Sequence, residues 1–256
     1  MMTNLDELKG PRYANVKDRN DIIAGIAAGR KIQFVTYALP DIMEHQLDFV
    51  IAAILKKFQK SHLQSTVYTC VKELVINATR ANARQAWFHE KQIDVSNPDI
   101  SSQHTEQIKA EISEDWIQKY GSLARDAGYM VSIDFEYDTD GMRIWIWNEV
   151  NLNSLDEKRI RERFKEGMAY EDIVSFYMEK GDQSQGEGMG LVMNLLLLKG
   201  EGIEPALLRI GRREGRTMAR LEVPFVEQFI SVRGPNPHGY DHEAVGMRLD
   251  YRDNNA

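Results

Sequence analysis

The chain contains two kinds of hydrophobic pattern. In the longer stretches apolar residues recur three or four positions apart, which predicts helices that pack one face on a core. In the shorter stretches apolar and polar residues alternate, which predicts half-buried strands. Helices are predicted at about residues 41–57, 64–89, 104–126, 154–167, 169–180 and 191–198. Strands are predicted at residues 31–39, 129–137, 142–148, 207–211 and 215–225.

Both ends of the chain differ from this patterned middle. Residues 1–30 are mostly polar, and Gly25 and Gly29, with alanines between them, favour a turn or a frayed helix. From Ser231 onward Gly, Pro and Asn accumulate before a highly charged end. We expect residues 227–256 to form a tail without a core of its own, docked on its own domain or on a partner.

The predicted helix at residues 64–89 carries a polar stripe. Glu73, Asn77, Arg80 and Arg84 are spaced so that they line up on one side of a helix. The opposite side carries Val67, Cys70, Val71, Leu74, Ala78 and Ala81. A carboxylate can accept a proton, a carboxamide oxygen suits Mg²⁺, and a guanidinium binds phosphate. The alternative is an ordinary solvated helix face.

A glycine-rich segment precedes the apolar run at residues 191–198. Residues 186–191 read Gly-Glu-Gly-Met-Gly-Leu. Glycines let a ligand approach the backbone, and the start of a helix offers unpaired N–H groups to an anion. The segment is not a dinucleotide fingerprint, since the preceding residues 179–185 are polar, and it lacks the Lys of a P-loop. The alternative is a flexible turn.

Taken together, the two motifs resemble the ATPase family of DNA gyrase, Hsp90, sensor histidine kinases and MutL, called GHKL or Bergerat-fold. Residues 73–78 match its N-box, Glu-x-x-x-Asn-Ala, and residues 186–191 match its second glycine box. Residues 207–225 resemble the hairpin that closes this fold, with a Gly-Thr turn before an alternating strand. The resemblance implies an α+β fold, a two-layer sandwich whose mixed, mostly antiparallel sheet has helices on one face.

The resemblance also implies roles for particular residues. Glu73 is the expected general base and Asn77 the expected Mg²⁺ ligand, while Arg80 contacts phosphate and the glycine backbone cradles it. The implied nucleotide-binding residues are Asn77, Arg80, Asn148, Gly186, Gly188, Met189, Gly190, Leu191 and Thr217. The implied ligands are ATP and Mg²⁺.

One segment departs from the family pattern. The first glycine box, Asp-x-Gly-x-Gly, normally binds adenine, and residues 148–152 read Asn-Glu-Val-Asn-Leu in its place. The side-chain oxygen of Asn148 accepts a hydrogen bond as Asp does, but without the charge, so affinity or base preference is expected to be weaker. Alternatively, Asn148 only ends its strand.

The family's domain layout also fits the chain. Residues 1–30 form an N-terminal extension, and residues 31–226 form the ATP-binding domain. Within that domain, residues of about 91–128 are an insertion. Two polar helical segments at about 152–187 occupy the place of the mobile ATP lid, with Gly181 and Gly186 as hinges.

Composition narrows the class of protein further. The 256 residues carry a net charge of −7 without a dense basic run, which argues against nucleic-acid binding. The single cysteine, Cys70, cannot form an internal disulfide and fits a reducing compartment. No apolar stretch has the length of a membrane span, so a cytoplasmic protein without membrane contact is expected.

The six histidines bear on the type of kinase. A sensor kinase needs a phospho-acceptor His followed by an acid, an apolar and a basic residue, on the N-terminal side of the N-box. His45 and His62 lie on that side but lack these neighbours, whereas His89 and His242 lie on the other side. A self-phosphorylating sensor kinase is therefore disfavoured.

Three functional interpretations stand. The leading one is a Mg-ATP-binding signalling protein that acts as an ATPase or as a stand-alone protein kinase, since Glu73 supplies the acid that hydrolysing members of the family have. The second is an anti-sigma-type regulatory module, in which nucleotide controls docking to a protein. The third is a degenerate fold that no longer binds nucleotide. Expected partners are ATP, a protein partner or substrate, and a second copy of the chain.

Overall fold

The computed structural model describes residues 16–93, 113–180, 188–233 and 247–250, and the single residues 8, 104 and 108. The helices are α1 (Arg19–Ala27), α2 (Asp41–Lys57), α3 (Gln64–Glu90), α5 (Glu114–Asp126), α6 (Ser154–Ala169), α7 (Ile173–Lys180) and α8 (Met189–Gly200). The strands are β1 (Ile32–Thr36), β2 (Val131–Tyr137), β3 (Gly141–Asn148), β4 (Leu208–Arg213), β5 (Arg216–Pro224) and β6 (Met247–Asp250). Short 3₁₀ turns at Ser61–Leu63 and Pro205–Leu207 precede α3 and β4.

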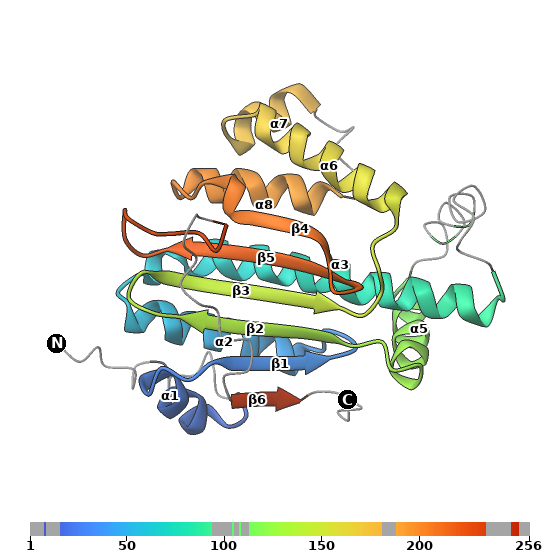
Figure 1. Cartoon of the computed structure of the whole chain (residues 1–256), viewed down its shortest axis with the longest axis horizontal. Coiled ribbons are helices and arrows are strands. Elements are labelled where there is room, and N and C mark those ends of the chain that lie inside the picture. Colours follow the sequence, from blue (N-terminus) through green and yellow to red (C-terminus); the bar gives the residue numbers. More distant parts are fainter. Residues whose placement is uncertain are drawn as a thin grey trace.

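The strands form one sheet in the order β4-β5-β3-β2-β1-β6. All neighbours are antiparallel except β1 and β6, which are parallel. Helices α2, α3 and α8 lie behind this sheet in Figure 1, and α6 and α7 lie beyond α8. The expected α+β fold with a mixed, mostly antiparallel sheet is therefore confirmed.

Strand β3 shows how the sheet divides its side chains between two faces. Met142, Ile144 and Ile146 belong to the main core, which they share with apolar residues of α2, α3 and α8. Trp145 and Trp147 lie on the other face and are also buried, with their rings stacked at a centroid distance of 5.9 Å. Burial on both faces explains why this segment reads as a nearly continuous apolar run.

Most predicted boundaries agree with the observed ones. Helix α2 begins directly after Pro40, whose fixed φ favours the first turn, and ends at Lys57 as predicted. Helix α3 extends one residue beyond the predicted 64–89. Strand β1 is shorter than the predicted 31–39, because the hydroxyl of Thr36 donates to the carbonyl oxygen of Ala38 and turns the chain. Helix α6 ends at Ala169, two residues beyond the predicted end at residue 167.

The turn or frayed helix predicted near residue 25 is confirmed in part, because the segment is a helix followed by a turn, but this helix is packed and not frayed. Residues 19–27 form helix α1, and Ile22 and Ile26 are fully buried in the main core. Gly29 follows the helix with φ +72°, a left-handed conformation that commonly ends helices. The two glycines favour a break in the helix, but Gly25 is a buried residue within α1.

The C-terminal tail contributes to the same sheet. Strand β6 pairs with β1 in parallel register, from Ile32 beside Met247 to Val35 beside Asp250. Nearer to β5, the ring of Phe229 lies 4.9 Å from the Arg143 guanidinium, on the face of the sheet away from the helices. The expected docking of the tail on its own domain is thus what the described residues show.

Candidate functional site

The polar stripe of α3 begins with a hydrogen-bonded pair. The amide Nδ2 of Asn77 donates to Oε1 of Glu73 over 3.0 Å. Glu73 is half-buried, whereas Asn77 and Arg80 are exposed. Since the amide nitrogen is turned toward the carboxylate, the amide oxygen of Asn77 is the atom left for another ligand.

The glycine motif meets this pair directly. Helix α8 begins at Met189, and its N-cap, Gly188, has φ +90°. A Cβ atom placed on Gly190 would lie only 2.0 Å from Oε1 of Glu73 and 2.1 Å from its Cδ. The carboxylate of Glu73 therefore rests against the first turn of α8, in space that exists because residue 190 is glycine.

The other predicted residues of this motif have different surroundings. Leu191 is buried in the main core, and Met189 packs on a small cluster around Phe176. Both side chains thus anchor the start of α8, and only their backbone is suited to a ligand. Gly186 lies outside the described residues.

An arginine of α6 lies at the same place. A Cβ atom on Gly188 would lie 2.9 Å from Nε of Arg163, whose Nη1 is 2.7 Å from Oε2 of Glu166. The sequence does not single out Arg163, because one arginine on a polar helix has no distinguishing spacing. Its position adds positive charge to the N-terminal end of α8, where the helix dipole already favours anions.

Arg84, the last member of the stripe, forms an ion pair within the protein. Nη2 of Arg84 lies 2.7 Å from Oδ2 of Asp156, near the start of α6. Asp156 is also held by Asn153, which caps α6. Arg84 therefore connects α3 to α6 and is not an open phosphate ligand.

Asn148 and Thr217 lie side by side at the ends of paired strands, and both bind the loop that follows β3. The Nδ2 of Asn148 donates to the carbonyl oxygen of Ala78 over 3.1 Å, and its Oδ1 accepts from the N–H of Val150 over 3.0 Å. The hydroxyl of Thr217 donates to the carbonyl oxygen of Val150 over 2.6 Å. Asn148 is also buried. Of the two interpretations of Asn148, this geometry favours the one in which it ends the strand.

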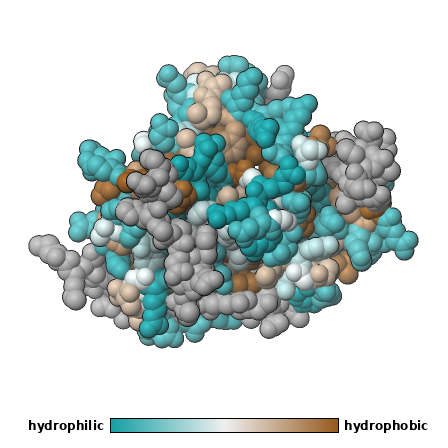
Figure 2. Space-filling model, in the orientation of Figure 1, coloured by the Kyte–Doolittle hydropathy of each residue, from teal (hydrophilic) through white to brown (hydrophobic). Residues whose placement is uncertain are grey.

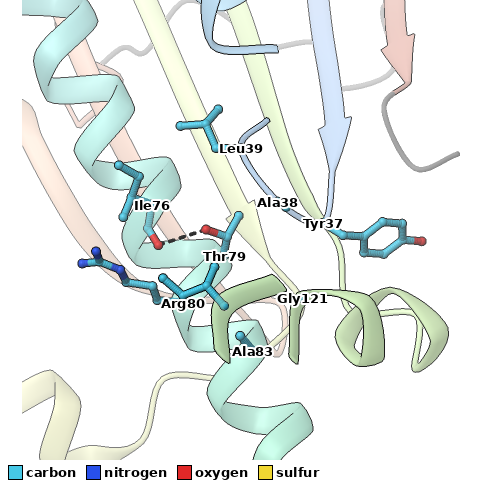
Figure 3. A pocket seen from close by; sticks show the side chains of 9 residues that line it. Tyr37, Ala38, Leu39, Ile76, Thr79, Arg80, Ala83 and Gly121 are labelled. Carbon is cyan, nitrogen blue, oxygen red and sulfur yellow. Dashed lines mark hydrogen bonds between the residues drawn. The ribbon is translucent and has the colours of Figure 1, made fainter. Parts of the chain in front are cut away.

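A hollow beside α3 shares Arg80 with the polar stripe but none of the other residues of the stripe. Figure 3 shows it between α3, the segment after β1, and α5, with a volume of about 200 Å³. Leu39, Ile76 and Ala83 make it mainly apolar. The stem of Arg80 lines its edge, while the guanidinium points away from Tyr37 and Leu39. The hollow does not join the Glu73–Gly190 contact.

The residues present fit one end of a Mg-ATP molecule better than the other. Gly188 and Gly190 let Arg163 and Glu73 lie against the start of α8, and the oxygen of Asn77 is of the kind that Mg²⁺ prefers. Within the described ranges, no group of three or more His, Cys, Asp and Glu side chains is placed to hold a metal ion. A Mg²⁺ ion here would therefore depend on Asn77 and on phosphate oxygens.

Comparison with known proteins shows a similarity to another protein but no family. No family model matches the chain, and no solved structure matches it. The chain is similar to an uncharacterized protein of Treponema pallidum (strain Nichols), with 28% identity over 209 residues. The match covers 82% of this chain and 40% of the relative. The chain thus spans about two fifths of the length of the protein that it matches.

None of the helices in the described part of the chain combines the length and the apolar character needed to cross a membrane.

Proposed function

We propose that this protein binds Mg-ATP and acts as a cytoplasmic ATPase or stand-alone protein kinase of the histidine-kinase-like type. One observation carries the proposal. Two motifs far apart in the sequence, each weak alone, meet in space, with Glu73 lying against Gly190. A solvated helix face and an unrelated flexible turn would have no reason to come together in this way.

The side chains have complementary tasks in this proposal. Glu73 accepts the proton of the attacking water or hydroxyl group, and the amide N–H of Asn77 holds its carboxylate in place. The oxygen of Asn77 would hold Mg²⁺, and the ion would supply positive charge to neutralise the phosphates. The start of α8 and the guanidinium of Arg163 attract the phosphates. Arg80, exposed one turn after Asn77, is the further phosphate contact.

The surroundings of Asn148 favour weak recognition of the adenine base. Because both polar groups of Asn148 are hydrogen-bonded within the protein, the amino group of adenine would have to compete for an occupied acceptor. We therefore propose weak discrimination between ATP and GTP. A protein substrate or partner remains part of the proposal.

Binding is tested by thermal unfolding with Asn77→Ala. Saturating Mg-ATP, at about 100 times its Kd, should stabilise the parent by about 2.7 kcal/mol and raise its melting temperature. The variant should lose most of that shift. Asn20→Ala removes an exposed asparagine from α1 and should keep it. If Mg-ATP at millimolar concentration shifts neither the parent nor the control, the degenerate fold replaces the proposal.

Chemistry is tested by phosphate release with Glu73→Ala. This variant should keep the thermal shift and lose turnover by about a hundredfold or more, as expected when a general base is removed. Equal turnover in parent and variant would reject Glu73 as the base. Retained binding with no turnover in either protein would favour the regulatory module of anti-sigma type, in which nucleotide only controls docking.

A further inference from the structure

Large apolar side chains are exposed on one short segment of the predicted lid. Four of them lie between residues 168 and 178 and together form what we call the α7 surface. They are Met168, Val174, Tyr177 and Met178, with exposed fractions of 50%, 61%, 48% and 83%. In Figure 2, tan and brown atoms gather at the top of the molecule, where Figure 1 places α6 and α7, with teal atoms around them.

Helix α7 is apolar on two sides. Its inner side is already packed, since Phe176 is fully buried against Val192 and Leu196 of α8. Val174, Tyr177 and Met178 follow the i, i+3, i+4 spacing on the outer side. The fold therefore holds α7 in place without using the outer side, and such a patch marks an interaction surface more often than chance exposure.

The charges around this patch differ between its two ends. Glu171 and Asp172 lie just before the first residue of α7, and both are exposed. Lys180 is the last residue of the helix and follows the exposed Glu179, and its Nζ lies 4.0 Å from Oε1 of Glu166. A second α7 laid antiparallel on the first would place Glu171 and Asp172 of each helix beside Lys180 of the other.

We propose that two copies of this chain associate through the α7 surface around a two-fold axis near Phe176. In that arrangement Val174 of each copy faces Met178 of the other, and Tyr177 lies next to the axis. Glu171 and Lys180 form two equivalent ion pairs across the interface. A two-fold interface requires a self-complementary patch of this kind. The proposal does not depend on nucleotide binding.

The size of the surface sets the expected strength. A helix of eight residues is about 12 Å long, so the contact is small compared with the surfaces of stable dimers. We expect a weak, reversible dimer that grows with protein concentration. Sedimentation velocity of the full chain over a range from micromolar to millimolar concentration should show a monomer–dimer equilibrium.

The apolar part is tested with Met178→Asp. A carboxylate facing the apolar Val174 of the other copy should lower the dimer association constant at least tenfold, in line with burial of an unpaired charge. Val226→Asp is the matched control, since Val226 is also exposed but lies beyond the end of β5. Equal weakening by both variants, or a parent that stays monomeric at millimolar concentration, would overturn the proposal.

The antiparallel geometry is tested by charge reversal. Glu171→Lys and Lys180→Glu each place like charges opposite one another twice, so each variant alone should dimerise about tenfold less than the parent. A mixture of the two restores both opposite-charge pairs, and heterodimers should appear in native mass spectrometry. Melting curves of the separate variants check that α7 remains folded. No gain in association on mixing would exclude this arrangement.

Discussion

At the scale of the residue, two asparagines with the same side chain have different roles. Asn77 is exposed, with its N–H group turned to Glu73. Asn148 is buried, and the backbone of Ala78 and Val150 uses both of its polar groups. Spacing along the helix was enough to single out Asn77. The role of Asn148 depends on a contact between β3 and α3, which sequence spacing does not encode.

Glu136 on β2 gives the clearest pH dependence. Burial raises its pKa to about 7 from an ordinary value of 4.5, although Lys31 lies 2.8 Å away and opposes the shift. The folded state thus holds a proton that the unfolded state releases, so this group costs stability as pH rises from 4.5 to 7.

The variant Glu136→Gln removes this titration. Its melting temperature minus that of the parent should become more positive between pH 5 and pH 8, because only the parent becomes charged there. Differential scanning fluorimetry at both pH values measures the change. Glu162→Gln, on the exposed side of α6, is the matched control for the chemical change itself. A difference for Glu136→Gln that does not change with pH would contradict the shift.

At the scale of elements, helix α6 is fitted closely to α8. A Cβ atom on Gly167 would lie 2.7 Å from Cδ1 and 3.2 Å from Cβ of Leu195, and 3.4 Å from Cα of Val192. Leu195 is fully buried and has no room to retreat. The predicted lid is therefore packed as a part of the fold in the described residues, and Lys199 adds hydrogen bonds to the carbonyl oxygens of Gly167 and Met168.

Replacing Gly167 by Ala should test this fit. Overpacking should cost about 1–3 kcal/mol, partly offset by the better helix propensity of alanine, so the net effect is a lower melting temperature. Gly121→Ala in α5 is the matched control, because a Cβ there meets nothing within 4 Å. It should stabilise the protein by up to about 1 kcal/mol. Denaturant unfolding would measure both, and a stabilised Gly167→Ala would show that α6 can move away.

Elements with a strong period were predictable, and those without one were not. Helices α2 and α3 and the strands β2 and β3 lie within two residues of their predicted bounds. Strand β6 was not predicted, since four residues are too few to establish an alternation. Of the site, spacing indicated Glu73 and Asn77. Arg163 was missed because only the packing of α6 brings it to Gly188.

At the scale of the whole molecule, segments from both ends of the described chain join the central fold, one in the core and one in the sheet. Helix α1 adds Ile22 and Ile26 to the core, and β6 covers the outer edge of β1. Without β6, the unpaired backbone groups of β1 would form an exposed edge, and such edges pair with other chains.

Ending the chain at Gly246 should reveal this role. Loss of the parallel ladder should lower the free energy of unfolding by about 2 kcal/mol or more and increase aggregation measured by light scattering. Removal of residues 251–256 alone is the control and should have little effect on either measurement. Unchanged stability of the longer truncation would mean that β6 is only an attachment.

The parallel pairing of β1 with β6 also concerns biosynthesis. Residues Ile32 and Met247 are direct neighbours in the sheet, yet they lie 215 positions apart in the chain, at positions 32 and 247. At an elongation rate of roughly 5–20 residues per second, β1 waits roughly ten to forty seconds for its outer partner on the ribosome. During that time its edge is open to other nascent chains, and a chaperone that shields β1 would have its greatest effect in this interval.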